Sequence, residues 1–156
     1  MQPQKPIAKV EGSRAIARFN RKPSPPWIVK LSPDMSSAEM RYTAIASTAY
    51  EEAVALEGFN TTVSDIIRGQ YGITEAGGIS GDPLRIRAHG KLQELCRIIQ
   101  EDGLDIDVIG VGGITHAGDA ADRLRAGPRV KMVGSLSGLL NRGFGLIPDI
   151  LKAIAA

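Results

Sequence analysis

The stretch VIGVGGITHAGDA, residues 108–120, joins a short apolar run to a helical pattern through two adjacent glycines. Val108, Ile109 and Val111 are typical of a buried strand, and the residues after 116 repeat at helical period. Because glycine has no Cβ, Gly112 and Gly113 can bring peptide N–H groups close to a phosphate. A plain tight turn between a strand and a helix would need the same two residues, so the rest of the chain has to decide between these interpretations.

The order of strand and then helix occurs four times along the chain. Ser36 and Glu39 have the spacing of a capping box at the start of the first helix. The expected strands are 27–32, 53–59, 105–111 and 130–135, and the expected helices are 36–53, 84–102, 117–127 and 145–156. Because parallel strands need a crossover, which a helix supplies, the pattern predicts an α/β fold with one parallel sheet.

Composition excludes several classes of protein. The 156 residues include 19 basic and 17 acidic ones, spread along the chain without a long run of one sign, so no nucleic-acid partner is predicted. No apolar run is long enough to span a bilayer, and the N-terminus lacks the apolar segment of a signal peptide. We therefore expect an intracellular chain without a transmembrane segment.

The polar and glycine-rich segments follow successive predicted strands. Residues 60–62 come after the second strand, Gly112 and Gly113 after the third, and Gly134 and Ser135 after the fourth. In parallel α/β sheets, ligands bind at the carboxyl ends of the strands. The sequence therefore predicts a binding site at this edge, over which the flexible segment GGISG (77–81) could fold.

Five segments carry a family resemblance by their order and spacing. They are IVKLSPDMS (28–36), FNTTVS (59–64), GGISGDPL (77–84), VIGVGGITHAGDA (108–120) and LRAG (124–127). Together they resemble the C-terminal half of dihydroorotate dehydrogenase, over residues 27–156. The Asn-Thr-Thr motif and the long loop before GGISG favour the quinone-linked branch, whose full-length members are membrane-associated.

The resemblance implies a (β/α)8 TIM barrel of which this chain forms only the C-terminal half, about four βα units after an irregular lead-in over 1–26. It implies an FMN cofactor that accepts a hydride from dihydroorotate, with a quinone as the electron acceptor. Lys30 matches a lysine beside the flavin ring, and Asn60 and Thr61 match residues that bind the orotate ring. The predicted backbone cradle for the ribityl chain and phosphate consists of Ser80, Gly81, Gly112, Gly113, Gly134 and Ser135.

The catalytic base of the family precedes the segments that match. Ser24, in FNRKPSPPW (19–27), lies too close to Trp27 to be the equivalent residue. We therefore expect the base to lie outside this chain and the chain alone to be inactive. Glu57 and Phe59 depart from the family pattern in the second strand.

The remaining reactive residue types are given structural roles. His89 and His116 are expected at the surface, Cys96 is expected in the core beside Leu92 and Ile99, and no cluster of residues has metal-ligand spacing. Two alternatives stay open: a phosphate-binding half-barrel without a flavin, and a non-catalytic half-barrel that associates with itself or a partner through its exposed sheet edges. A flavin absorbance band tests the first, and size-exclusion chromatography tests the second.

Overall fold

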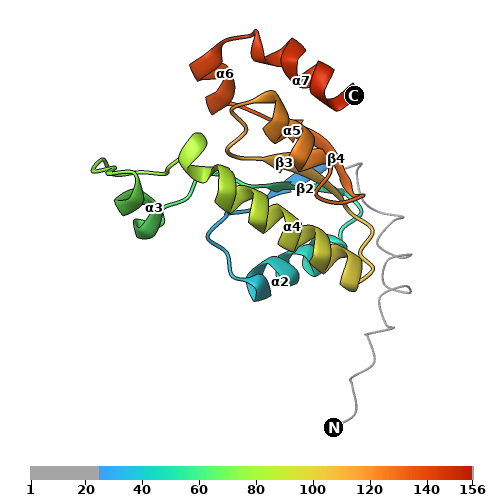
Figure 1. The fold of residues 1–156 in the computed structure, drawn as a ribbon. Helices are drawn as coiled ribbons and strands as arrows, with labels where there is room; N and C mark the ends of the chain where they lie inside the picture. Colours follow the sequence, from blue (N-terminus) through green and yellow to red (C-terminus); the bar gives the residue numbers. More distant parts are fainter. Residues whose placement is uncertain (1–24, 156) are drawn as a thin grey trace, which may run out of the picture.

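A four-stranded parallel sheet forms the centre of the molecule. The computed structural model describes residues 25–155 (Figure 1). The strands are β1 (Trp27–Lys30), β2 (Ala53–Gly58), β3 (Asp107–Val111) and β4 (Val130–Gly134), and they lie in this order in the sheet. All three strand pairs are parallel. The predicted sheet of βα units is confirmed.

Helices connect the strands and cover one face of the sheet. They are α2 (Ser37–Ser47), α3 (Asp65–Gln70), the 3₁₀ turn η1 (Asp82–Leu84), α4 (Arg85–Glu101), α5 (Ala117–Leu124), α6 (Ser137–Arg142) and α7 (Leu146–Ala155). The capping box of Ser36 and Glu39 is present at the start of α2. The predicted extension of this helix to residue 53 is wrong, because the Trp27 N–H already pairs with the Glu52 carbonyl as β2 begins.

Two short helices were not predicted. The segment 60–81 was expected as a loop, but it contains α3, whose Arg68 guanidinium donates to the carbonyls of Glu75 and Gly77. The second is α6, which follows β4 directly. Both have six residues, which is too short for a helical repeat to stand out in the sequence.

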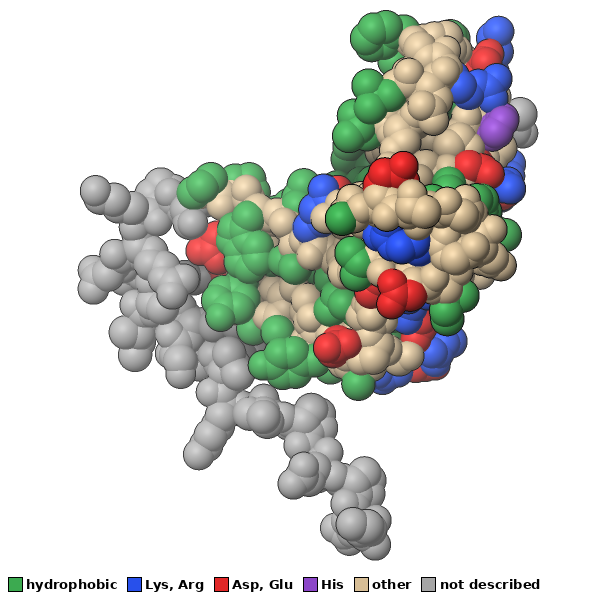
Figure 2. Space-filling model, turned by 90° about the vertical axis from the view of Figure 1, so that its left-hand side faces the viewer, with side chains coloured by type: hydrophobic (Ala, Val, Ile, Leu, Met, Phe, Trp, Pro, Cys, Tyr) green, Lys and Arg blue, Asp and Glu red, His purple; other side chains and the backbone are tan. Residues whose placement is uncertain are grey.

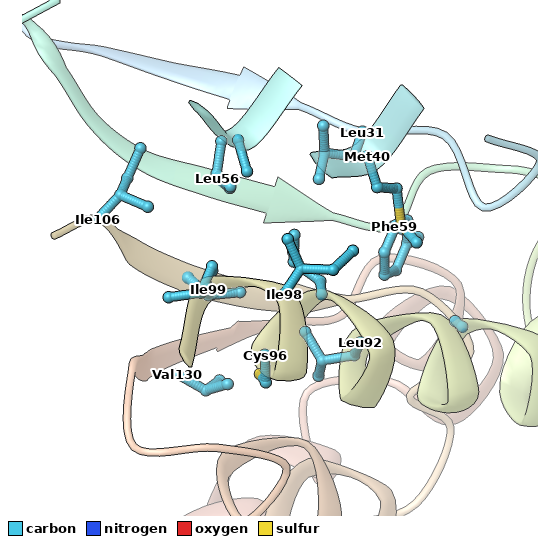
Figure 3. Packing of buried hydrophobic residues seen from close by; sticks show 14 of the residues in the cluster. Leu31, Met40, Leu56, Phe59, Leu92, Cys96, Ile98, Ile99, Ile106 and Val130 are labelled. Carbon is cyan, nitrogen blue, oxygen red and sulfur yellow. The ribbon is translucent and has the colours of Figure 1, made fainter. Parts of the chain in front are cut away.

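The hydrophobic core lies between the sheet and α2 and α4. Leu56 of β2 packs with Met40 of α2 and with Leu92 and Ile98 of α4 (Figure 3). Val108 of β3 belongs to the same cluster. These side chains are fully buried or nearly so. Burial of this apolar area is the main term that stabilises the sheet and fixes the direction of its carboxyl edge.

The opposite face of the sheet carries a row of side chains that crosses all four strands. In the strand register, Lys30 lies beside Glu57, Glu57 beside Ile109, and Ile109 beside Met132. Ile28 and Met132 on this face are exposed. No helix within 25–155 packs over this row, since α2 and α4 pack on the other face of the sheet (Figure 1).

The final helices form a projecting lobe with further exposed hydrophobic residues. Helix α7 packs against α5, and Figure 2 shows hydrophobic side chains along the upper part of the molecule, where α6 and α7 lie. Leu136, Leu140 and Phe144 are exposed there. Between residues 25 and 155 the structure has no helix that is both long and apolar enough to cross a membrane.

Candidate functional site

A pocket opens at the carboxyl ends of the strands. Its empty volume is about 580 Å³, counting space that is open to solvent. Its lining includes every residue predicted from the sequence: Lys30, Asn60, Thr61, Ser80, Gly81, Gly112, Gly113, Gly134 and Ser135. The structure therefore brings together residues that are up to 105 positions apart in the chain (135 − 30).

Gly112 and Gly113 form the turn that leaves β3. Both have positive φ, of 90° and 67°. A Cβ at Gly112 would lie 2.6 Å from the Phe59 carbonyl oxygen, and one at Gly113 would lie 2.3 Å from the Cα of Arg85. The sequence interpretation explained these glycines by room for a phosphate. In the structure, the atoms that exclude a Cβ belong to the protein, so close packing of the Phe59 carbonyl against Gly112 and of Arg85 against Gly113 is itself sufficient reason for both glycines.

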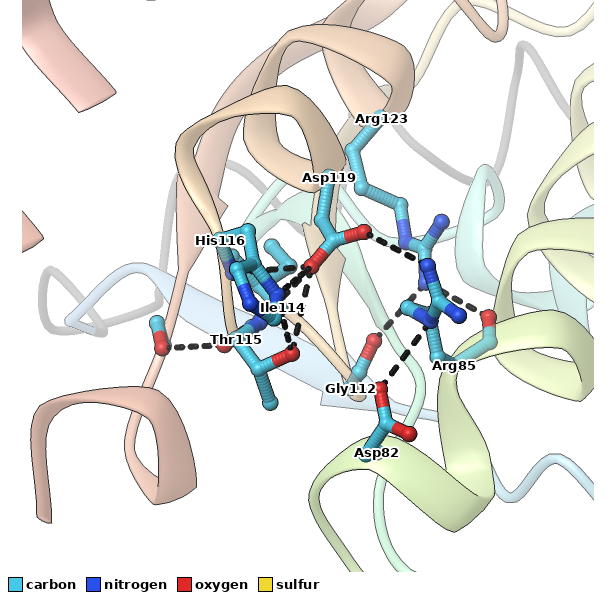
Figure 4. A network of polar contacts seen from close by, with 9 residues as sticks. Asp82, Arg85, Gly112, Ile114, Thr115, His116, Asp119 and Arg123 are labelled. Carbon is cyan, nitrogen blue, oxygen red and sulfur yellow. Dashed lines mark hydrogen bonds and ion pairs between the residues drawn. The ribbon is translucent and has the colours of Figure 1, made fainter. Parts of the chain in front are cut away.

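The segment 112–116, called the β3 loop, is held by a network of polar contacts (Figure 4). One carboxylate oxygen of Asp119 accepts from the N–H groups of Thr115, at 2.9 Å, and His116, at 2.8 Å. Arg123 donates from one terminal nitrogen to the Gly112 carbonyl, at 3.0 Å, and to the Arg85 carbonyl, at 2.9 Å. The loop is thereby tied to α5 on one side and to the start of α4 on the other.

The charge of Asp119 is stabilised although its side chain is buried. Burial raises the pKa of Asp119, but the backbone N–H groups of Thr115 and His116 and the charge of Arg85 outweigh that effect. The pKa of this carboxyl therefore lies below its usual value. Asp119 is an anion that holds the loop in place, and its hydrogen bonds face the backbone and Thr115.

The loop after β2, residues 59–81, is called the β2 loop and is anchored differently. Asp34, after β1, accepts from the Thr62 hydroxyl at 2.5 Å and from the Val63 N–H at 2.8 Å. Arg87 forms an ion pair with Asp34 at 3.1 Å. Thr62 and Ile79 also form an antiparallel bridge. These contacts fix both ends of the β2 loop, and Asn60 and Thr61 lie at its first anchor.

Lys30 has an ionic partner within the sheet. Its ammonium lies 3.1 Å from a carboxylate oxygen of Glu57, and the two side chains are 53% and 24% exposed. Glu57, one of the two departures from the family pattern, has its side chain on the open face of the sheet, where it neutralises the neighbouring lysine. Phe59, the other departure from the family pattern, is fully buried in the core.

Serine hydroxyls join the remaining loops of the pocket. The Ser135 hydroxyl donates to the Ile114 carbonyl at 2.7 Å and so connects the end of β4 to the β3 loop. The Ser137 hydroxyl donates to Ser80 at 2.9 Å and connects α6 to the β2 loop. Each of the three hydroxyls therefore already holds a neighbouring segment.

The histidine and cysteine predictions have mixed outcomes. His116 is exposed, as predicted. The prediction for His89 is wrong: it is half-buried against α5, its Nδ1 has no hydrogen-bond partner in the described structure, and burial lowers its pKa. Cys96 is buried in the core, as predicted, and burial raises the pKa of its thiol to about 11, which disfavours the reactive thiolate.

Sequence reasoning missed the residues that anchor the loops of the pocket without lining it. Asp34, Asp119 and Arg123 were not singled out. Asp119 carries a usable signal, because an acidic residue three positions after His116 has the spacing of a helix cap. Arg123 has none, since a basic residue on a short helix is normally solvated.

A parallel βα sheet with a glycine-lined pocket at the carboxyl ends of its strands defines a partial barrel of the (β/α)8 type. The chain belongs to the dihydroorotate dehydrogenase family, whose model matches residues 5–156. Two curated quinone-type dihydroorotate dehydrogenases support the quinone branch. The chain is 37% identical over 133 residues to the one from Paracidovorax citrulli and 34% identical over 149 residues to the one from Acidithiobacillus ferrooxidans.

A solved structure supports the same fold. The ligand-free dihydroorotate dehydrogenase of Eimeria tenella superimposes with a TM-score of 0.69 at 25% identity, over 81% of this chain and 34% of that one. The alignments with the two curated relatives cover 84% and 94% of this chain but only 35% and 39% of those proteins. The chain thus spans somewhat more than a third of the length of these relatives.

Proposed function

We propose that this chain forms the FMN-binding side of a dihydroorotate dehydrogenase active site. The observation that carries the proposal is that all nine residues predicted from the family pattern line one pocket. The family is flavin-dependent. The dihydroorotate dehydrogenase activity of the curated relatives favours this function over a phosphate-binding barrel without a flavin.

The residues of the pocket fit a phosphorylated flavin. The pocket encloses about 170 Å³, less than the roughly 300–1,000 Å³ that is usual for cofactor sites, so it would take in only part of an FMN molecule. Within the described structure, the N–H of Gly113 has no hydrogen-bond partner, although Gly113 lines the pocket. Unpaired N–H groups on a glycine turn are suited to bind an anion. We assign the phosphate to Gly112, Gly113, Gly134 and Ser135.

The remaining residues of the pocket would orient the ring and the substrate. Bound FMN would supply the hydride acceptor for dihydroorotate oxidation. Lys30, at the end of β1, would place a positive charge beside the flavin ring, with Glu57 limiting its net effect. Asn60 and Thr61 would hydrogen-bond the planar orotate ring, which presents both donors and acceptors. Ser80 and Gly81 would contact the ribityl chain from the β2 loop.

We place the catalytic base outside residues 25–155. No carboxylate, imidazole or thiol is among the described residues that line the pocket, and Ser80, Ser135 and Ser137 are engaged in hydrogen bonds. Ser24, the other serine considered, lies outside the described residues. We propose a quinone as the electron acceptor, because the two curated relatives are quinone-type enzymes.

Self-association is a second proposal and rests on the open sheet face. Within 25–155, β1 and β4 each pair on one side only, and exposed Ile28 and Met132 lie on that face. Unpaired edges and exposed apolar residues favour association. Sedimentation of the chain at increasing concentration tests this, and a monomer throughout would contradict it.

Flavin binding is the direct test of the proposed function. We expect the purified chain to bind FMN, with a flavin absorbance band that persists through gel filtration. With dihydroorotate and a quinone analogue, we expect no appreciable orotate formation, because a positioned base typically contributes about 10²–10⁴-fold to the rate. Absence of FMN binding would contradict the site, and robust turnover would contradict the placement of the base.

A further inference from the structure

Arg123 is an unusual side chain in this protein because it is charged and almost completely buried. It is 2% exposed, on the face of α5 that packs toward the start of α4. It donates hydrogen bonds to two backbone carbonyls, those of Gly112 and Arg85, and its Nε has no hydrogen-bond partner in the described structure (Figure 4). Burial lowers the pKa of its guanidinium, while the charges of Asp119 and Asp122 partly oppose this.

Packing alone does not account for an arginine at this position. Burying a guanidinium without a close carboxylate costs free energy, and an apolar side chain of similar size would fill the space without that cost. The two carbonyls that Arg123 joins belong to the β3 turn and to the first residue of α4. The side chain therefore acts on the backbone that lines the pocket.

We propose that Arg123 is a positioning residue for the anion site: it sets the direction of the peptide between Gly112 and Gly113. In a planar trans peptide, the C=O and the following N–H point in opposite directions. Since the Gly112 carbonyl is turned toward Arg123, the Gly113 N–H is turned away from it. This unpaired N–H is then available to a phosphate oxygen in the pocket.

The positive charge of Arg123 adds to this orientation. The guanidinium lies behind the turn and outside the pocket lining, so it acts on an anion through the polarised Gly112–Gly113 peptide rather than by direct contact. Binding of the uncharged part of a ligand would not depend on Arg123. The inference rests on the proposed FMN site and predicts which part of FMN depends on Arg123.

A comparison of FMN with riboflavin, which lacks the phosphate, isolates this role. We expect Arg123→Gln to weaken FMN binding by about 10- to 100-fold, as for loss of one charge-assisted hydrogen bond, and to leave riboflavin binding nearly unchanged. Arg123→Lys keeps the charge but not the fork of donors and should give an intermediate loss. Arg125→Gln is the matched control, because Arg125 is the C-cap of the same helix, is 68% exposed and forms an ion pair with Asp122 at 3.7 Å.

The two ligands separate positioning from simple destabilisation. Equal loss of FMN and riboflavin affinity, or unchanged preference for FMN in folded Arg123→Gln, would overturn the inference. If that variant does not fold, the same comparison on Arg123→Lys decides.

A second readout does not depend on flavin binding. In the wild-type chain, inorganic phosphate should shift the Gly113 amide resonance, and this response should be lost in the Arg123 variants. An equal response in wild type and variants would overturn the inference. If the wild type binds neither FMN nor riboflavin, the proposed function fails. The response of the Gly113 amide to inorganic phosphate then decides whether Arg123 positions an anion site.

Discussion

The β3 loop and the β2 loop line the same pocket but are held in opposite ways. The β3 loop has five residues and is fixed by buried groups, with Asp119 and Arg123 taking up its N–H and C=O groups. The β2 loop is much longer and is fixed at two points, Thr62 and Ile79, while the contacts of Arg68 between them are exposed. The β3 loop is therefore held by buried contacts along its length, whereas the β2 loop is held only near its two ends.

The difference has a consequence for binding. Backbone that is held by buried hydrogen bonds opens only with much of the fold, whereas segments with exposed hydrogen bonds open locally at lower free energy. The β3 loop is therefore suited to present a fixed set of donors to a phosphate. The β2 loop is suited to admit a ligand and to close over it.

The largest effect is expected at the β3 turn. In Gly113→Val, valine would have to adopt a positive φ of 67°, and its Cβ would lie 2.3 Å from the Cα of Arg85. We expect loss of FMN retention and a fall in unfolding free energy of more than about 3 kcal/mol, measured by denaturant titration. Gly90→Ala is the control: Gly90 lies on the exposed side of α4, where a Cβ would meet nothing within 4 Å, and the change should stabilise the helix by up to about 1 kcal/mol. Full FMN retention in Gly113→Val would show that the turn does not need its present backbone.

The next effect in size concerns Asp119. Asp119→Ala leaves the N–H groups of Thr115 and His116 without their acceptor and should cost about 2–3 kcal/mol at neutral pH. The lowered pKa of Asp119 means that its stabilising effect is complete above pH 3.8, the usual value, and is lost as the pH falls through the lower value in the folded protein. The unfolding temperature, measured from neutral pH down to pH values below 3.8, should therefore fall less for the variant than for the wild type. If the unfolding temperatures of wild type and variant fell equally with pH, Asp119 would not stabilise the loop as an anion.

This comparison also marks what the sequence could predict. The four strands follow from apolar periodicity, which is a local signal, and the pocket residues follow from the short segments that carry the family resemblance. The buried contacts of Arg123 and the pairing of Asp34 with Thr62 join segments 11 and 28 positions apart. Nothing in the local sequence specifies such contacts, because they depend on how α4 and α5 pack. For the same reason, the half-burial of His89 was missed.

A smaller effect is expected at the anchor of the β2 loop. Thr62→Val removes the hydroxyl that donates to Asp34 from a fully buried side chain and should cost about 1–2 kcal/mol. Amide hydrogen exchange at Val63 and Ile79 should become faster, with little change at Thr115. Thr62→Ser keeps the hydroxyl and should retain most of the protection. Faster exchange spread equally over both loops would contradict their separate anchoring.

The smallest effect is expected at the open face of the sheet. Lys30 and Glu57 form a partly exposed pair, and such pairs contribute about 1 kcal/mol or less. Glu57→Gln should therefore change the unfolding free energy by less than this amount. A loss as large as that of Asp119→Ala would show that the pair is part of the structural core of the site.

The central claim is that the carboxyl edge of the sheet binds FMN, and amide chemical-shift mapping tests it most directly. The chain has a second pocket at the opposite edge, lined by Cys96, Gly103, Pro128 and Arg129 among others, which serves as an internal control. On titration with FMN, we predict shifts at Asn60, Gly112, Gly113 and Ser135 and none around Gly103. Shifts centred on the opposite pocket, or none at either edge, would contradict the account.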